Sequence, residues 1–221
     1  MKLLLGAFGD PGHAFPMIAL GRALRERGHE VTLQTAQAWE SLVRAEGIGF
    51  APAPEYPVFP TRERPLKPYQ AVLLATDETQ PLVDELAPDI VVHDILTLAP
   101  ALAAERAGVK VATLVPHVDP RTAPGAPPYS VGALPARTRL GRGLWQSLRP
   151  TTDKGLESGR RELNETRRRL GLAPVAHLHS GLSRALTMVA SFPMLEYPRP
   201  PEPATEIIGP LRWEPPSDAV P

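Results

Sequence analysis

The sequence predicts an α/β fold in which a parallel sheet carries helices on both faces. Short apolar runs alternate with helical patterns along most of the chain. Such alternation is typical of parallel sheets, because each strand must return through a helix that covers one face. Of the 221 residues, 43% are hydrophobic, which is enough for a sizeable core. We therefore expect a Rossmann-like arrangement.

The chain begins with a strand, a turn, a helix and a second strand. An apolar run from Leu3 to Phe8 ends at the glycine-rich turn Gly9-Asp10-Pro11-Gly12, and an amphipathic helix then runs to Gly28. A second apolar run, Val31 to Thr35, follows. In open parallel sheets such a turn lies at the carboxyl edge, where ligands bind.

The same alternation continues toward the middle of the chain. Helices are expected over 37–45, 69–86 (broken near Pro81) and 96–107, and strands over 48–51, 90–93 and 109–115. Gly28, Gly47 and Gly108 follow the helical patterns and are typical helix stops. We expect the strand order 3-2-1-4-5, which is that of a doubly wound sheet.

The last third of the chain is less regular. A helical region is expected over about 136–170, with Leu156, Leu163 and Leu170 on one face and Gly171 as its cap. A sixth strand over 186–190 precedes a proline-rich tail that contains one more apolar pair, Ile207-Ile208. Two further proline-rich stretches, 52–68 and 116–135, are interpreted as long loops.

Composition excludes several classes of protein. The chain has no cysteine, which excludes disulfides and thiolate metal sites. Its 24 basic residues are balanced by 24 acidic ones, which argues against a nucleic-acid partner. The first strand is interrupted too soon for a secretory signal, and no apolar run is long enough to span a membrane. We therefore expect a soluble, cytoplasmic protein.

His13 and Asp94 are the pair of residues most suited to chemistry. His13 follows the first strand and Asp94 the fourth, and these strands are neighbours in the expected order. Their helices leave on opposite faces, so a crevice opens between their carboxyl ends. A carboxylate fixes the tautomer of a neighbouring imidazole and favours the imidazolium, as a general base for a hydroxyl requires. Alternatively, Asp94 caps the next helix and His13 is a turn residue.

The glycines of the first turn do not indicate a dinucleotide site. Gly6, Gly9 and Gly12 are not spaced as GxGxxG, and the second strand ends in Gln34-Thr35 where such a site needs an acid. A nucleotide-dependent oxidoreductase is therefore disfavoured. We interpret the glycines as serving tight turns, and Gly12 as allowing a ligand to approach the helix terminus.

The other histidines and the arginine run have simpler interpretations. His93 is expected in the core, whereas His117 either lines the crevice or fills a loop. His177 and His179 lack a third ligand nearby, so metal binding is disfavoured. The arginines between 160 and 169 alternate with glutamates and are interpreted as a solvated helix face.

Three segments of the chain stand out as sequence blocks: GDPGHAFPMIALGRALRERGHEVT, PDIVVHDILTLAPALAAERAGVKVATLVPH, and ASFPMLEYPRPP followed by TEIIGPLRWEPP. In this order and spacing they resemble the amino-terminal half of GT-B glycosyltransferases, especially the bacterial natural-product and UDP-glucosyltransferase-like enzymes. The resemblance implies an acceptor-binding domain over 1–210 and the start of an interdomain linker over 211–221. It also implies a carboxyl-terminal domain for the nucleotide-sugar, which this chain lacks.

The resemblance also assigns chemical roles. His13 is then the general base that deprotonates the acceptor hydroxyl, with Asp94 as its partner, and the proline-rich stretches 52–68 and 116–135 are acceptor loops. Sugar transfer proceeds by displacement with inversion, without a metal or a resident cofactor. The nucleotide-sugar, carrying UDP or TDP, is a co-substrate held by the carboxyl-terminal domain. We therefore expect the 221-residue chain alone to be inactive.

The expected acceptor is a small lipophilic hydroxyl compound, because the loops carry aromatic side chains. The expected acceptor-binding residues are Asp10, Phe8, Tyr56, Phe59, Tyr69, His117 and Tyr129. Gly12 is expected near the donor phosphates. The rival hypothesis is a stand-alone, non-catalytic module of the same fold that binds a ligand or a partner protein. Association into a homodimer stays open.

Overall fold

A computed structural model describes residues 1–56, 66–129 and 131–216. Within these residues, seven parallel strands form one sheet in the order β3-β2-β1-β4-β5-β6-β7. The predicted fold class and the order of the first five strands are thus confirmed. The strands are β1 (Lys2–Gly6), β2 (Glu30–Thr35), β3 (Gly49–Pro52), β4 (Ile90–Asp94), β5 (Lys110–Val115), β6 (Thr187–Val189) and β7 (Thr205–Ile207).

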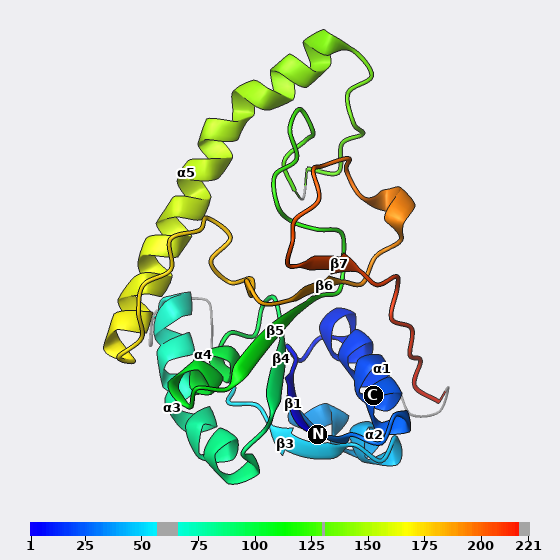
Figure 1. Ribbon diagram of the computed structural model, residues 1–221, viewed down its shortest axis with the longest axis vertical. Helices are drawn as coiled ribbons and strands as arrows, with labels where there is room; N and C mark the ends of the chain where they lie inside the picture. Colours follow the sequence, from blue (N-terminus) through cyan, green and yellow to red (C-terminus); the bar gives the residue numbers. More distant parts are fainter. Residues whose placement is uncertain (57–65, 130, 217–221) are drawn as a thin grey trace.

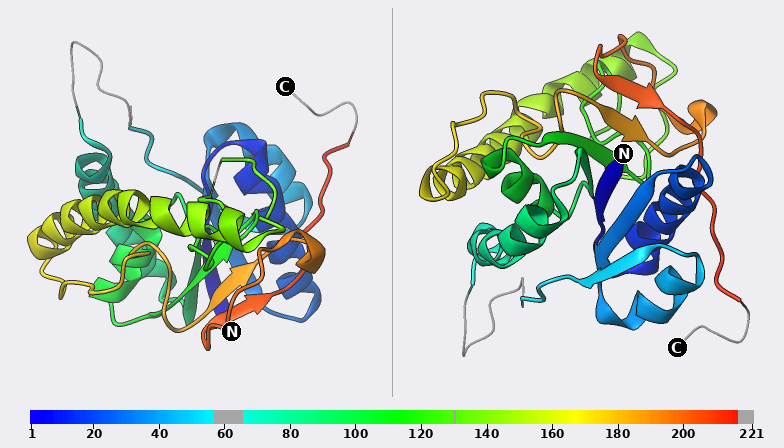
Figure 2. Two further views of the ribbon diagram at one scale, coloured as in Figure 1. Left: turned by 90° about the horizontal axis from the view of Figure 1, so that it is seen from above. Right: turned by 60° about the horizontal axis from the view of Figure 1, so that its bottom comes forward.

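The helices cover both faces of this sheet. Helices α1 and α2 lie on one face, and α3 and α4 lie on the other (Figures 1 and 2). Two short 3-10 turns, η1 (Gln37–Trp39) and η2 (Pro193–Leu195), join neighbouring elements. The helices are α1 (Pro11–Glu26), α2 (Glu40–Ala45), α3 (Pro68–Leu86), α4 (Ala99–Arg106) and α5 (Arg139–Arg169).

The core forms because side chains alternate along the buried strands. On β1, Leu3 and Leu5 pack toward α1 and α2, whereas Leu4 packs toward α3 and α4. Leu4 and Leu5 are fully buried. Each such side chain contributes about 1.5–3 kcal/mol relative to an exposed one. Burial on both faces makes β1 the centre of the molecule, and the chain that leaves β1 is therefore held in a defined position.

The helix ends follow the expected signals, with one difference. Gly28, Gly47, Gly108 and Gly171 adopt positive φ angles where helices end, as predicted. The break expected at Pro81 is absent, because α3 continues from Pro68 to Leu86. Pro81 removes one backbone hydrogen bond, but Val83 on the following turn is buried in the core and keeps the helix in place.

The carboxyl-terminal third differs most from expectation. The pair Ile207-Ile208 was predicted to lie in an irregular tail, but Thr205–Ile207 forms β7 at the edge of the sheet. Arg167 was predicted to be solvated with its neighbours, yet it is buried and pairs with Glu105 of α4. It also donates to the carbonyl of Ala173 at 2.7 Å. Arg167 therefore connects α5 to the rest of the domain and does not belong to the solvated face of the helix.

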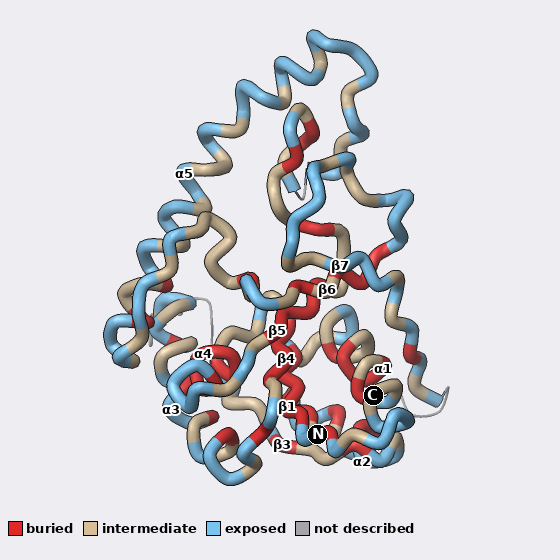
Figure 3. Tube along the Cα trace, in the orientation of Figure 1, coloured by how far each residue is buried: buried red, intermediate tan, exposed pale blue. Residues whose placement is uncertain are grey.

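Helix α5 extends well beyond the body of the domain. Its carboxyl-terminal half packs on α3 through Leu163 and Thr166, and the Thr166 hydroxyl donates to the Tyr69 carbonyl at 2.8 Å. Its amino-terminal half projects away from the sheet and is largely exposed along its length (Figures 1 and 3). None of the helices formed by the described residues is both long and apolar enough to cross a membrane.

Candidate active site

The first turn of α1 places His13 at the carboxyl edge of the sheet. Asp10 is the N-cap, and its carboxylate accepts a hydrogen bond from the His13 backbone N–H at 3.0 Å. Pro11 at the first helical position loses nothing by lacking an N–H. The Trp39 indole donates to the Gly9 carbonyl at 2.7 Å and fixes the turn from the other side. His13 is the third residue of α1, and not the turn residue of the alternative interpretation.

Asp94 lies opposite His13 at the end of β4. Its Oδ1 atom is 3.1 Å from His13 Nδ1, so the predicted contact is present between the neighbouring strands β1 and β4. The Asp94 carboxylate is buried and accepts three further hydrogen bonds. These come from the Leu96 N–H at 2.6 Å, the Thr97 hydroxyl at 2.9 Å and the Phe8 N–H. A buried carboxylate with this many donors is held ionised in one position.

His13 and Asp94 each shift the pKa of the other. Burial lowers the pKa of the His13 imidazole, but the hydrogen bond and charge of Asp94 and the charge of Asp10 outweigh burial, so this pKa is raised. Burial raises the pKa of Asp94, but the hydrogen bond and charge of His13 and the Phe8 and Leu96 N–H groups outweigh it, so this pKa is lowered. The pair therefore favours an imidazolium beside a carboxylate, with His13 Nε2 as the nitrogen that Asp94 does not occupy.

The glycines of the first turn serve close packing and not left-handed backbone. Among the described residues, the glycines with positive φ do not include Gly6, Gly9 or Gly12. A Cβ atom at Gly6 would lie 2.6 Å from Pro100 Cγ, and one at Gly9 would lie 2.6 Å from Ala36 Cβ. Gly9 lies in the bend between β1 and α1, whereas Gly6 belongs to the strand and Gly12 to the helix. At Gly12 a Cβ would lie 3.1 Å from the capping Asp10 carboxylate.

Several predicted acceptor residues gather around His13. The Phe8 and His117 rings each lie 6.2 Å from the His13 ring, centroid to centroid, in edge-on orientations. The Tyr129 ring lies 5.2 Å from that of His117, and its hydroxyl is 3.1 Å from His117 Nδ1. The Phe8 and His117 rings thus lie next to the His13 imidazole, and the Tyr129 ring lies next to that of His117.

The other predicted acceptor residues make different contacts. The Tyr56 hydroxyl donates to Glu78 on α3. Tyr69 is the second residue of α3, and its carbonyl accepts a hydrogen bond from the Thr166 hydroxyl of α5. Burial raises the pKa of Tyr69, and the charge of Glu162 adds to the rise. Phe59 lies outside the described residues.

No group of three or more metal-ligating side chains occurs within residues 1–56, 66–129 and 131–216. His177 uses Nε2 in a hydrogen bond to the Leu182 carbonyl at 3.3 Å. His93 is fully buried, as predicted, and burial lowers its pKa.

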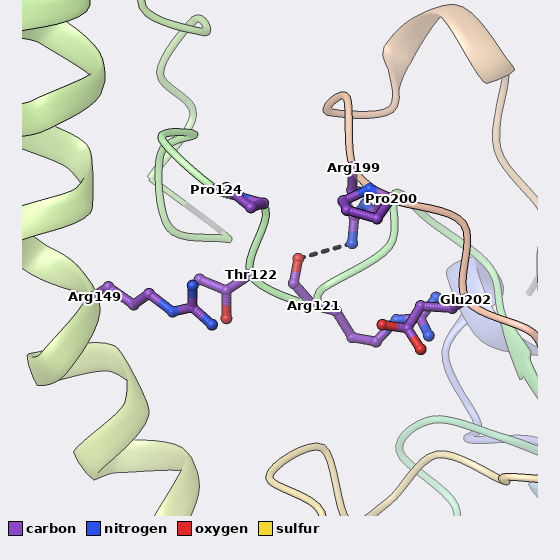
Figure 4. Close-up of a pocket in the computed structure, with 7 residues that line it drawn as sticks. All are labelled: Arg121, Thr122, Pro124, Arg149, Arg199, Pro200 and Glu202. Carbon is purple, nitrogen blue, oxygen red and sulfur yellow. Dashed lines mark hydrogen bonds between the residues drawn. The ribbon is translucent and has the colours of Figure 1, made fainter.

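Sequence reasoning missed an ionic cluster beneath the loop after β5. Asp119 is buried and pairs with Arg121 and, at 3.2 Å, with Arg199. The Arg199 guanidinium also donates to the Arg121 carbonyl at 2.8 Å, as Figure 4 shows. No motif indicates a pair separated by about 80 positions, so only the fold brings them together.

A pocket of about 190 Å³ adjoins this cluster. Its walls come from α5, the loop after β5 and the segment before β7 (Figure 4). Its lining residues are Arg121, Thr122, Pro124, Arg149, Arg199, Pro200 and Glu202. Asp119 and Glu196 offset the charges of Arg121 and Arg199, so the pocket is not an open cationic site. It contains none of the groups around His13.

Comparison with known proteins identifies the family of the chain. The family model described as the glycosyltransferase family 28 N-terminal domain matches residues 3–113. The 4'-demethylrebeccamycin synthase of Lentzea aerocolonigenes is 25% identical over an alignment that covers 100% of this chain and 58% of the relative. The L-demethylnoviosyl transferase of Streptomyces niveus is 32% identical over 49% of this chain and 33% of its own length.

A solved structure shows the same fold. The glycosyltransferase SsfS6 of Streptomyces sp. SF2575, complexed with thymidine diphosphate, superposes with a TM-score of 0.58 at 21% identity. The superposition covers 89% of this chain and 51% of that one. This likeness establishes the fold as the amino-terminal half of a GT-B structure. The chain spans about half the length of this structure and 58% of the first relative.

Proposed function

The chain belongs to the family of glycosyltransferase family 28 N-terminal domains, and from this premise we propose that it is the acceptor-binding half of an inverting glycosyltransferase. His13 is the general base of the transfer and Asp94 is its partner. The observation that carries the proposal is the 3.1 Å contact between His13 Nδ1 and the buried Asp94 carboxylate at the carboxyl edge of the sheet. A histidine fixed in this way can take a proton near neutral pH.

The chemistry follows from which imidazole nitrogen is occupied. Asp94 binds the Nδ1 side of His13, so Nε2 accepts the proton of the acceptor hydroxyl. The acceptor oxygen forms a bond to the anomeric carbon of the sugar while the bond from that carbon to the diphosphate oxygen breaks. The electron pair leaves with the diphosphate, and the configuration at the carbon inverts. Asp94 stabilises the imidazolium that forms, as a buried carboxylate does in other histidine bases.

The surroundings of His13 suit a lipophilic acceptor. Phe8, Leu96 and Tyr129 are 44%, 55% and 40% exposed, and each belongs to the segments in contact with His13, Asp94 or His117. Exposed apolar side chains beside a few polar groups are typical of small-molecule sites. His117 and Tyr129 supply the polar groups that would orient an acceptor hydroxyl.

The nucleotide-sugar would be held by a second half of the protein. One structural relative carries thymidine diphosphate in a chain about twice as long as this one. We therefore place donor binding, and hence completed transfer, outside these 221 residues. The rival function is a non-catalytic module that binds a ligand or a partner through the same edge of the sheet, for which no His13 proton transfer is needed.

Expression of the reading frame to its own stop codon tests the proposal. The purified product is supplied with TDP- and UDP-sugars and a panel of lipophilic hydroxyl compounds, and product stereochemistry is read by NMR. We expect transfer with inversion, and a loss of turnover by roughly 10²–10⁴-fold in His13→Ala, the usual range for loss of a general base. His29→Ala is the matched control, because His29 lies beyond the end of α1 that is opposite to His13.

Each contrary result has a definite meaning. Transfer with retention, or unimpaired turnover in His13→Ala, would contradict His13 as the base of an inverting enzyme. Acceptor binding without any transfer would favour the non-catalytic module. Circular dichroism of each variant ensures that a lost activity is not lost folding.

A further inference from the structure

Asp94 is held at its backbone as well as at its carboxylate. Its carbonyl oxygen accepts a hydrogen bond from the Thr97 N–H at 3.0 Å and is 2.8 Å from His93 Nδ1. The carboxylate of the same residue accepts from the Leu96 N–H and the Thr97 hydroxyl. The turn from Asp94 to Thr97 therefore carries half of the donors that hold the carboxylate. Whatever fixes this turn also fixes the partner of His13.

His93 is fully buried and has one defined protonation state. Burial lowers its pKa, so the imidazole is neutral. A neutral imidazole has one N–H donor and one acceptor nitrogen. A carbonyl can only accept, so Nδ1 carries the proton and donates it to the Asp94 carbonyl. Nε2 is then the acceptor, and the Thr113 hydroxyl lies 2.8 Å from it.

The hydroxyl of Thr113 is fixed in turn by its own partners. Its oxygen accepts from the Ser183 N–H at 2.8 Å, which leaves the hydroxyl proton free to point at His93. The Ser183 hydroxyl donates to the Val111 carbonyl at 2.6 Å. The chain of bonds runs from Asp94 through His93 and Thr113 to the segment before β6. Every proton in it has one acceptor, so the tautomer of His93 is not free to change.

The side chains of His93 and Asp94 point to opposite faces of the sheet, since neighbours on a strand alternate. His93 pairs in register with Thr113 on β5, which explains their contact. The His93 imidazole therefore does not contact the Asp94 carboxylate, nor would it contact a bound acceptor substrate. It reaches the site through the Asp94 carbonyl, at the point where β4 ends and the turn begins.

From these contacts we propose that His93 is a positioning residue for the transfer, which holds the Asp94–Thr97 turn so that the Asp94 carboxylate stays in contact with His13. The inference rests on the proposed function for its catalytic meaning. Its structural content, the dependence of the His13–Asp94 contact on the His93 Nδ1–H group, can be measured in the absence of any sugar transfer.

Two conservative variants separate the two nitrogens of His93. In His93→Asn the amide nitrogen can occupy the place of Nδ1 and donate to the Asp94 carbonyl. In His93→Gln the longer amide reaches the place of Nε2 and bonds to Thr113 instead. Both keep the site polar and of similar volume. The proposal requires that Asn preserves the position of Asp94 and that Gln does not.

The measurement is the titration of the His13 imidazole by NMR in the 221-residue chain, with His13→Gln used to assign the resonance. The charged and titratable groups that face His13 are Asp94, Asp10 and His117, and all three are unchanged in the variants. We expect the raised pKa of His13 to fall toward its ordinary value in His93→Gln and to stay raised in His93→Asn. A pKa of His13 that is unchanged in both variants, or lowered equally in both, would overturn the proposal.

A second pair of variants covers the case in which His93→Gln does not fold. Thr113→Ser keeps the hydroxyl on His93 Nε2, whereas Thr113→Val removes it at nearly the same volume. With Nε2 left without a donor, the tautomer that serves Asp94 is no longer fixed. We expect the pKa of His13 to fall in Thr113→Val and not in Thr113→Ser. The same result in both would contradict the proposal.

Activity of the product of the complete reading frame gives the catalytic readout. We expect kcat to fall by up to about 10²-fold in His93→Gln with KM little changed, because a small displacement of a catalytic group is costly. His93→Asn should restore most of the loss. If the wild-type product transfers no sugar but the pKa of His13 follows the variants as expected, the proposed function fails and the positioning role stands. If transfer occurs and kcat is the same in the His93 variants as in the wild type, only the positioning role fails.

Discussion

At the scale of single residues, Asp94 contacts His13 but does not cap the next helix, because α4 begins at Ala99 with Leu98 as its N-cap. It accepts hydrogen bonds from the Leu96 N–H and the Thr97 hydroxyl, as a residue that organises the start of the next segment does. It also contacts His13 Nδ1 at 3.1 Å. Two carboxylate oxygens have enough lone pairs for both tasks. The local role places the carboxylate, and the contact with His13 uses that placement.

The pKa shifts of this pair predict the pH dependence of transfer. A base acts when unprotonated, and the pKa of His13 is raised, so kcat/KM should increase with pH through a value above that of an ordinary histidine. In Asp94→Asn the negative charge is gone, and the pKa of His13 falls. The rising limb should then move to lower pH while the plateau drops by roughly 10²–10⁴-fold.

The measurement is a pH profile of kcat/KM for the product of the complete reading frame. Asp84→Asn, an exposed carboxylate on α3, is the matched control and should leave both the limb and the plateau in place. A limb that stays at the same pH in Asp94→Asn would show that His13 is not the group that titrates.

The residues of this pair could be predicted because chain order determines sheet topology. Strands one and four are adjacent in a doubly wound sheet, so residues that follow them must meet. Asp119 and Arg199 could not be predicted, since loops from different parts of the chain bring them together and neither follows a regular pattern. Arg167 has the same charge as its neighbours, and only the packing of α5 distinguishes it.

At the scale of elements, close packing explains more of the glycines near the site than turn formation does. Gly6 at the end of β1 faces Pro100 of α4, and Gly9 faces Ala36 after β2. Each lets two elements approach to a distance that a side chain would prevent. The site depends on this packing, because the end of β1 leads directly into the first turn of α1.

Substitution of glycine by alanine should therefore have opposite effects in two elements. In Gly6→Ala the new Cβ would meet Pro100 Cγ at 2.6 Å. Neither β1 nor α4 can move freely, so the free energy of unfolding should fall by about 1–3 kcal/mol, as in other overpacked cores. In Gly143→Ala, on the exposed part of α5, no atom lies within 4 Å of the new Cβ. The free energy of unfolding of Gly143→Ala should rise by roughly 0.5–1 kcal/mol, because alanine has a higher helix propensity than glycine.

Urea denaturation followed by circular dichroism measures both changes. Gly155→Ala, which also has open space around its Cβ on α5, should behave like Gly143→Ala. A stable Gly6→Ala protein would mean that β1 and α4 are not packed as closely as the structure indicates.

Strand β7 shows why short elements escape sequence analysis. It has three residues, and two of them, Glu206 and Ile207, are exposed. Three residues are too few for an alternating pattern to be recognised. Its pairing with β6 is a property of the sheet edge and not of its own composition. The longer strands, β1, β2, β4 and β5, are buried and apolar enough to be recognised.

At the scale of the whole molecule, the chain after β7 returns to the first helix. Trp213 is buried against Phe15 of α1, with ring centroids 5.0 Å apart, and its indole donates to Glu46 at 2.6 Å. The residues that follow β7 therefore pack on the same face as the helix that carries His13 (Figure 1). Helix α5 projects on the other side.

This arrangement predicts that the 221-residue chain alone binds nucleotide-sugars weakly. Proteins bind a diphosphate through backbone N–H groups at a helix N-terminus or through cationic side chains that have no other partner. In the described part of the chain, the His13 N–H is already bound by the Asp10 cap, and carboxylates pair with Arg121 and Arg199. Within the described residues the edge offers apolar contacts and a base, and we expect these residues to bind a diphosphate only weakly.

Calorimetry with TDP- and UDP-sugars should therefore show no binding tighter than about millimolar, the weak end of the affinity scale. A lipophilic hydroxyl compound that serves as acceptor should bind the same chain measurably, and its affinity should drop in Tyr129→Ala but not in the exposed Leu140→Ala. Transfer requires the sugar carbon to be held in line with the acceptor oxygen, and binding of the nucleotide-sugar supplies most of the energy for this. Sugar transfer by the chain alone should therefore be undetectable. Micromolar binding of a nucleotide-sugar would instead place a complete donor site within these residues. It would contradict the proposal that one half of the protein binds the acceptor and the other half binds the donor.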